Sequence, residues 1–236
     1  MKYFILSLLI LVSVNSNSQI KKKIKIEYST NYIGEVLTED SKRKTAGLES
    51  VYSGIENKIN TLKFSLLIDN NISEFKSIST MINDNETSGD KMARIYTGEQ
   101  TVFFRDFINK RLVQNLDFSA KTYTTEIDLN KINWILENEE KLIDGYKCYK
   151  ATYKHKFVYV TAWYCPSIPY STGPIEYGGL PGLILELQRN KLVYTATSIN
   201  LNFEGKETIN FPDKNIISED ELNAILKKST KNLNND

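Results

Sequence analysis

Histidine, cysteine and proline are scarce in this sequence, which has one histidine, two cysteines and five prolines among 236 residues. Two thiols and the single His155, distant from both, do not make a zinc site. Basic and acidic side chains nearly balance, 30 against 29, so the basic excess typical of nucleic-acid-binding proteins is missing. The composition therefore predicts no metal, no cofactor and no nucleic-acid partner, and it identifies no catalytic set.

Long apolar runs are also missing, except at the beginning of the chain. Lys2 is followed by an apolar run over residues 3–14 and then by the small residues Ser16 and Ser18. This order of parts predicts a signal peptide over residues 1–18, with Gln19 as the first mature residue. The run is shorter than the ~20 residues that a membrane-spanning helix needs. We expect an exported protein that is periplasmic or associated with the outer membrane, without a transmembrane segment once the signal is removed.

Tyrosine, phenylalanine and threonine alternate with polar residues along most of the chain, which is the pattern of half-buried strands. Neither a linker nor a repeat divides it, so residues 19–236 are expected to form a single β-rich domain. The expected fold is mainly β: a single antiparallel meander sheet, curved or half-barrel, with one or more packing helices. We expect strands near residues 20–28, 61–69, 74–81, 91–97, 100–107, 110–114, 121–129, 145–154, 157–165, 182–188 and 191–203.

One helix is well marked near the C-terminus, in the segment SEDELNAILKK. Ser218 and Glu221 have the spacing of a capping box, and Leu222, Ile225 and Leu226 form one apolar stripe. We expect this C-terminal helix to pack on the sheet.

The only two cysteines, Cys148 and Cys165, lie in two neighbouring strands. If residues 145–154 and 157–165 form a hairpin with a four-residue loop, Cys148 falls opposite Cys165, and Tyr149 falls opposite Tyr164. An even number of cysteines in an exported protein favours a disulfide. Two separate buried thiols are the next alternative and a catalytic thiol the last. In this register Tyr164 points inward and Trp163 outward.

The segment GPIEYGGLPGLILEL combines glycines and prolines with large aliphatic residues. A phosphate-binding loop would lead into a helix, whereas a strand-like run follows here. We therefore expect a packed corner, with a ligand-contacting loop as the alternative. This signature corner, residues 178–184, consists of Gly178, Gly179, Leu180, Pro181, Gly182, Leu183 and Ile184.

The segment YGGLPGLILEL resembles the signature of the GLPGLI family, uncharacterised exported proteins of Bacteroidetes-type bacteria. WILENEEKLIDGYKCYKAT and AWYCPSIPYSTGP, which precede it, resemble the family as well, so the resemblance covers residues 132–190. It implies an exported, β-rich protein and supplies no catalytic residues. Cys165 departs from the family pattern, so the disulfide rests on the hairpin alone.

Three functions follow from these observations. The first is a non-enzymatic envelope module that binds an apolar ligand or a partner protein; half-barrel carriers of the lipoprotein-chaperone type are a fold analogy. The second is a hydrolase that uses a carboxylate pair, for which the candidates are Glu176, Glu186, Asp106 and Asp144. The third is a structural protein of the outer membrane that docks through an exposed partner loop, residues 166–177, which contains Pro166, Pro169, Tyr170, Pro174 and Tyr177.

Overall fold

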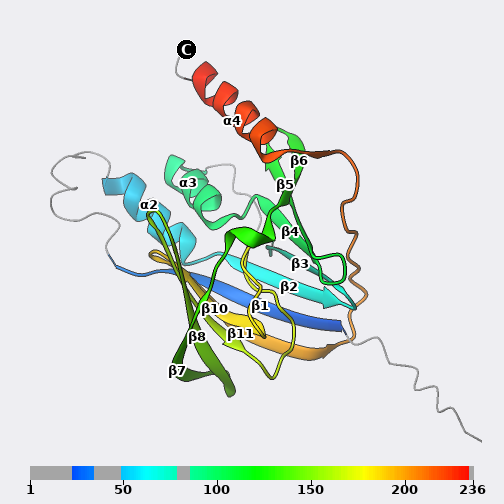
Figure 1. The fold of residues 1–236 in the computed structure, drawn as a ribbon. Helices are drawn as coiled ribbons and strands as arrows, with labels where there is room; N and C mark the ends of the chain where they lie inside the picture. The colour runs from blue at the N-terminus through cyan, green and yellow to red at the C-terminus, as the bar shows by residue number, and fades with distance from the viewer. Residues whose placement is uncertain (1–22, 35–48, 79–85, 234–236) are drawn as a thin grey trace, which may run out of the picture.

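A single sheet of twelve strands forms the body of the protein in the computed structural model, which describes residues 23–34, 49–78 and 86–233 (Figure 1). The predicted signal peptide lies outside these residues. The strands are β1 (Lys23–Tyr32), β2 (Lys63–Asp69), β3 (Ile72–Ser77), β4 (Thr101–Asp106), β5 (Arg111–Phe118), β6 (Lys121–Ile127), β7 (Ile135–Ile143), β8 (Tyr146–His155), β9 (Val158–Cys165), β10 (Leu183–Arg189), β11 (Leu192–Phe203) and β12 (Ile216–Ile217). The helices are α2 (Glu49–Ile59), α3 (Ser88–Thr97), α4 (Glu219–Leu233) and the 3-10 turn η1 (Leu129–Lys131).

The sheet consists of two meanders joined through the first strand. Its order is β12-β6-β5-β4-β3-β2-β1-β11-β10-β9-β8-β7, and every pair is antiparallel except β12 with β6. The mainly β, antiparallel fold is therefore confirmed. From β1, in the middle of the sheet, the chain runs outward to β6, crosses to the opposite edge at β7 and returns to β11 beside β1.

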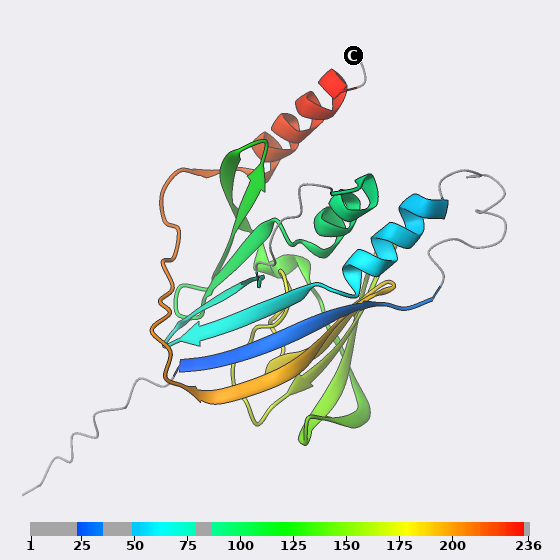
Figure 2. The same cartoon turned by 180° about the vertical axis from the view of Figure 1, so that it is seen from behind.

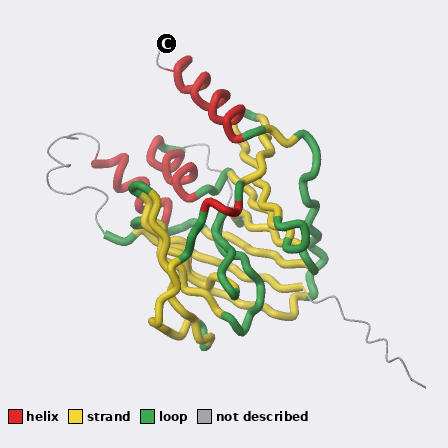
Figure 3. The backbone as a smooth tube through the Cα atoms, in the orientation of Figure 1, coloured by secondary structure: helices red, strands yellow, loops and turns green. Residues whose placement is uncertain are grey.

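The crossover from β6 to β7 shows that the sheet is strongly curved. The two strands are ten positions apart in the sheet, which is about 48 Å in a flat sheet with strands ~4.8 Å apart. Only residues 128–134 join them, and a chain of this length spans at most about 28 Å. The two arms must therefore bend toward each other, and in Figure 3 the crossover and the loop before β10 run between them.

One predicted strand is a helix, and one helix and one long strand were not predicted from the sequence. Residues 91–97 belong to helix α3, which a capping box of Thr87 and Asp90 begins and Gly98, in the left-handed conformation, ends. Helix α2 and strand β7 have no counterpart among the predicted elements. The first strand is rich in lysine, which is typical of edge strands, yet it lies in the centre of the sheet. Its isoleucines face the core and its lysines face the other side.

An aromatic cluster fills the centre of the core. Tyr28, Phe64, Phe75 and Tyr194 come from four strands, and the four contacting pairs have ring centroids 5.3–6.2 Å apart. The two buried hydroxyls have partners: Tyr28 donates to the carbonyl of Ile184 at 2.8 Å, and Tyr194 donates to that of Thr97 at 2.6 Å. The first strand, helix α3 and the signature corner are thus tied to one core.

The β8–β9 hairpin has the predicted register, with Tyr149 opposite Tyr164 and His155 opposite Val158. Tyr164 is buried and Trp163 half-buried, as predicted. Both cysteines are buried free thiols, so the predicted disulfide is not present in the structure. Each thiol has its own partner: Cys165 Sγ lies 3.0 Å from Ser167 Oγ, and Cys148 Sγ donates to the carbonyl of Tyr146 at 3.5 Å.

The C-terminal helix forms as predicted. The hydroxyl of Ser218 accepts a hydrogen bond from the backbone N–H of Glu221 at 3.1 Å, which is one half of the expected capping box. Leu222 is buried, and α4 contacts β6 at the end of one arm. Figure 2 shows the segment after β11 rising along the side of the sheet to reach this helix.

Candidate functional site

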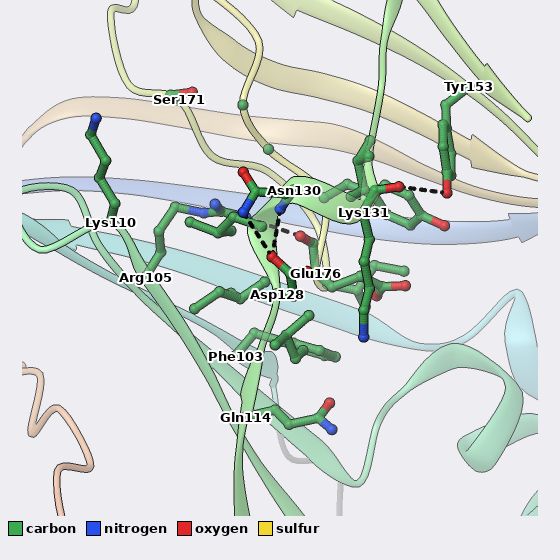
Figure 4. A pocket seen from close by; sticks show the side chains of 18 of the residues that line it. Phe103, Arg105, Lys110, Gln114, Asp128, Asn130, Lys131, Tyr153, Ser171 and Glu176 are labelled. Carbon is green, nitrogen blue, oxygen red and sulfur yellow. Dashed lines mark hydrogen bonds between the residues drawn. The ribbon is translucent and has the colours of Figure 1, made fainter. Parts of the chain in front are cut away.

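A cleft of about 930 Å³ lies between the inner side of β4–β6, the crossover and the loop before β10 (Figure 4). Five parts of the chain that are distant in sequence line it. They are residues 95–114, residues 127–134, Tyr153, residues 171–179 with Arg189, and Glu219. The cleft exists because the crossover holds the two arms of the curved sheet near each other.

Arg105, the penultimate residue of β4, is the most deeply buried cation of the cleft lining, with 6% of its surface exposed. Alternation along β4 turns Phe103 and Arg105 toward the cleft, while Phe104 packs against Phe211 outside it. One terminal nitrogen of Arg105 donates to the carbonyl of Glu176 at 2.9 Å, and its buried Nε has no hydrogen-bond partner. Burial lowers the pKa of Arg105 to about 10, so the side chain stays charged at neutral pH.

The loop before β10 carries the signature glycines and supports both Arg105 and Trp134. A Cβ on Gly178 would lie 2.7 Å from a terminal nitrogen of Arg105, so glycine alone lets the guanidinium lie against this backbone. The carbonyl of Gly178 accepts a hydrogen bond from the indole of Trp134 at 2.8 Å. Tyr153, from β8, donates to the carbonyl of Lys131 at 3.0 Å and packs against Trp134. One loop thus positions both a cation and an aromatic ring of the cleft lining.

Most of the carboxylates of the cleft are engaged in local structure. Asp106 accepts hydrogen bonds from the backbone of Ile108 and Asn109, and Asp128 caps η1. Glu219 pairs with Lys131 at 2.6 Å. These three groups stabilise turns and the contact with α4.

Glu176 differs from the other acids of the cleft. Burial raises the pKa of its carboxyl, and the nearby Arg189 opposes this only in part. Arg189 in turn donates to the carbonyl of Tyr96. Glu176 and Arg189 therefore form the polar end of the cleft, next to the C-terminal end of α3.

The four carboxylates proposed for a hydrolase do not come together. Glu176 and Asp106 line the cleft, whereas Glu186 pairs with Lys141 at 2.7 Å outside it. Asp144 is exposed in the tight turn between β7 and β8, with a φ of 49°. The structure thus brings together two of the four acids, one of which is engaged in its own turn.

The signature corner is tightly packed. Leu180, Leu183 and Ile184 are almost completely buried. A Cβ on Gly182 would lie 2.5 Å from the carbonyl carbon of Cys165, so the chain passes too close here for any other residue. The turn differs from the type II turn that the Pro181–Gly182 pair indicates: the N–H of Gly182 donates to the carbonyl of Leu180, a three-residue turn. The corner also extends into the cleft lining through Gly178 and Gly179, and the alternative of a ligand-contacting loop stays a prediction.

The predicted partner loop is less exposed than expected. Pro166 and Pro169 are exposed, but Pro174 and Tyr177 are buried, and Tyr170 packs against Phe107 at 5.9 Å between ring centroids. The loop folds back into the sheet because its hydrophobic residues complete the core. Its inner side lines the cleft instead of a docking surface.

Arg105 and Trp134, the two residues that best define the cleft, were not predicted from the sequence. An arginine within the apolar run TVFFRD was a usable signal, because such a residue faces the core side of its strand or a cleft. Trp134 gives no signal of its own, since its position depends on the crossover. Among the described residues, no group of three histidine, cysteine, aspartate or glutamate side chains could hold a metal ion, and no helix is both long and apolar enough to cross a membrane.

Comparison with known proteins supports the fold. Residues 154–186 match the model of a family described as "Protein of unknown function (Porph_ging)", and the match contains the signature corner. No curated protein matches the sequence. Two solved structures of PNGF-II, in the C2 and P21 space groups, are similar at 17% identity with TM-scores of 0.54 and 0.57. They cover 86% and 88% of this chain but only 32% and 34% of their own, so this chain spans about a third of their length.

Proposed function

We propose that this protein is a binding module of the cell envelope that takes a small molecule in the cleft between β4–β6, the crossover and the signature loop. The observation that carries the proposal is the cleft itself. Its volume of about 930 Å³ lies in the range of small-molecule sites. The aromatic cluster under the centre of the sheet is closely packed, so this opening is not a general property of the interior.

The lining favours an amphipathic ligand over the purely apolar one that the sequence suggests. Phe103, Trp134 and Tyr177 supply aromatic surface, while Gln114, Asn130 and Arg105 supply polar groups. The amides of Gln114 and Asn130 each donate one hydrogen bond within the protein, to Thr125 and Asp128. Apolar walls with a few convergent polar groups are typical of sites that orient a specific molecule. An apolar carrier would have little use for so many polar groups.

A binding role fits the lining better than a hydrolase does. Catalysis by paired carboxylates needs two acids at a set distance with different protonation behaviour. Here Asp106 and Asp128 are used by turns and Glu219 by an ion pair, which leaves Glu176 without an acidic partner of this kind. Membership of the GLPGLI family and export to the periplasm or the outer membrane are part of the proposal, supported by the N-terminal sequence and the signature corner.

The two tryptophans provide a test, because Trp134 lines the cleft and Trp163 lies outside it beneath Lys141. A chemically diverse set of small molecules is titrated into wild type, Trp134→Phe and Trp163→Phe, and fluorescence and calorimetry are recorded together. Ligands of the cleft should change the fluorescence of wild type and Trp163→Phe but not that of Trp134→Phe. If calorimetry finds no ligand, or only ligands that leave the Trp134 signal unchanged, the cleft is not the binding site.

A further inference from the structure

We propose that the cleft recognises an oxyanion, a carboxylate or phosphate group, on an aromatic or apolar ligand, and that Arg105 is the residue that binds it. This inference rests on the proposed function and adds the chemical class of the ligand. It also assigns a role to a side chain that the fold alone does not explain.

The positive charge of Arg105 has no acidic partner among the residues that the structure describes. None of their carboxylates lies within 4.0 Å of its guanidinium, and its single hydrogen bond is to the backbone carbonyl of Glu176. Its cross-strand neighbours are Ser73 on β3 and Leu112 on β5, which are uncharged. A buried charge without a partner is costly, and proteins seldom retain one without a use.

The other charges of the cleft do not neutralise Arg105. Asp106 and Asp128 accept hydrogen bonds from their own turns, and Glu219 pairs with Lys131. The carboxyl of Glu176 interacts with Arg189. Burial raises the pKa of this carboxyl, and the charge of Arg189 lowers it by a smaller amount. Lys110, at the turn after β4, is a further cation of the lining, in addition to Lys131 and Arg189. The lining holds four basic and four acidic side chains, and an incoming anion would find Arg105 as the buried cation that none of these acids pairs with.

The surroundings of the guanidinium are built to hold it in place. Gly178 leaves room for the plane of the guanidinium against the loop. The loop is anchored beside Arg105, because the hydroxyl of Thr172 lies 3.3 Å from that of Ser73, the cross-strand neighbour of Arg105 on β3. A planar guanidinium that is fixed in this way suits the two oxygens of a carboxylate or phosphate. The rings of Phe107, Trp134 and Tyr153 line the same cleft, which explains why the rest of the ligand should be aromatic or apolar.

The test uses matched sets of small aromatic molecules, each comprising a carboxylic acid, its primary amide and the corresponding phosphonate. Affinities are measured by calorimetry, and binding in the cleft is assigned by the Trp134 fluorescence. The acid or the phosphonate should bind wild type at least about tenfold more tightly than the amide, as expected for a charged hydrogen bond. Whichever of the two binds more tightly identifies the oxyanion.

Three variants separate recognition from folding. Arg105→Met should abolish the preference for the anion and raise or preserve the thermal midpoint, because it removes a buried charge without a partner. Arg105→Lys should retain a part of the preference. Arg111→Met is the matched control, since Arg111 pairs with Glu126 outside the cleft and its loss should leave the preference unchanged.

The remaining outcomes contradict the inference in distinguishable ways. Equal affinity of acid and amide for wild type would exclude oxyanion recognition while leaving the proposed binding function intact. A preference that persists in Arg105→Met would assign it to another cation. A clear fall of the thermal midpoint in Arg105→Met without any change in preference would show that Arg105 is structural. If no member of any set binds at Trp134, the proposed function fails, and this inference with it.

Discussion

At the scale of single residues, the three signature glycines are needed for different reasons. Gly178 allows the guanidinium of Arg105 to lie close to the loop backbone. Gly182 allows the carbonyl of Cys165 to lie close to the backbone of the signature corner. Gly179 has a φ of 84° and open space around its α-carbon, so its requirement is conformational. Substitution of these three glycines is therefore expected to have a different effect at each position.

Gly182→Ala should prevent stable folding, and Gly182→Val should be at least as damaging. A Cβ at this position would overlap the backbone of Cys165, which cannot move without shifting the end of β9. Gly145→Ala is the matched control, because Gly145 also has a positive φ, of 79°, but nothing within 4 Å of its Cβ position. It should cost only the strain of the left-handed conformation, on the order of 1–3 kcal/mol.

Denaturant unfolding of both glycine variants measures this difference. Unfolding midpoints that are equal for Gly182→Ala and Gly145→Ala would show that the corner is not packed as described.

The thiol of Cys148 should make the protein less stable at alkaline pH. Burial, together with the neighbouring Cys165 thiol, raises the pKa of Cys148 to about 12, against about 8.5 in an unfolded chain. The unfolded chain then loses this proton first, so the stabilisation is complete below about pH 8.5 and is lost as the pH rises toward 12. The advantage of wild type over Cys148→Ala should shrink by up to about 1.4 kcal/mol per pH unit across this window.

Urea unfolding of wild type and Cys148→Ala at several values between pH 8 and pH 10.5 checks the alkaline effect. The buried tyrosines are common to both proteins, so their titration cancels in the difference. A difference that does not vary with pH would contradict a buried, neutral Cys148.

At the scale of elements, helix α3 shows how a local signal can be overlooked. Alternation within residues 91–97 predicts a strand, yet Thr87 and Asp90 have the spacing of a capping box, and Gly98 marks the C-terminal end. The β8–β9 hairpin was predictable to the residue because its pairing is local and both faces constrain the register. Helix α2 and strand β7 carry no comparable signal in the sequence. The middle of β7 is polar and rich in charge, as suits an edge strand.

Thr87→Ala should destabilise the protein by about 1 kcal/mol at neutral pH, because it removes the N-cap of α3. The hydrogen bonds from Thr87 lower the pKa of Asp90, so their contribution is present above the ordinary pKa of aspartate, near 4, and is lost as the pH falls through the lowered value. Thermal unfolding of Thr87→Ala and of Ser88→Ala, an exposed neighbour, at pH 7 and pH 3 measures both effects. An equal loss for the two variants at pH 7 would refute the cap.

At the scale of the whole molecule, the sequence predicts the class of the fold but not how the two arms of the sheet bend toward each other. Alternating strands with short turns indicate an antiparallel sheet, and turn signals are local. The central place of β1 and the crossover from β6 to β7 depend on contacts between distant residues, such as that of Trp134 with Gly178. The cleft is a product of this bending, so its lining could not be assembled from the sequence, although Glu176, Asp106 and Tyr177 were each singled out for other reasons.

The same topology predicts how protection from exchange with solvent is distributed. β1 pairs on both sides, with β2 and β11, and it contributes Tyr28 to the aromatic cluster of the core. β7 lies at one edge of the sheet, while the pair of β6 with the two-residue β12 closes the other. Because local opening needs least free energy where fewest buried contacts are lost, amide exchange should be slowest in β1, β2 and β11 and fastest in β7, β12 and α4.

Hydrogen exchange followed by mass spectrometry, on wild type and Tyr28→Phe, tests this order. The variant loses the hydrogen bond from the Tyr28 hydroxyl to the carbonyl of Ile184, so exchange should accelerate in β1 and β10 and remain unchanged in β7. The effect should correspond to about 1 kcal/mol, the usual net contribution of one such bond. If β7 were protected as strongly as β1, or if it responded to Tyr28→Phe, the two arms would open as one unit with the centre, and the fold would not be organised around its first strand.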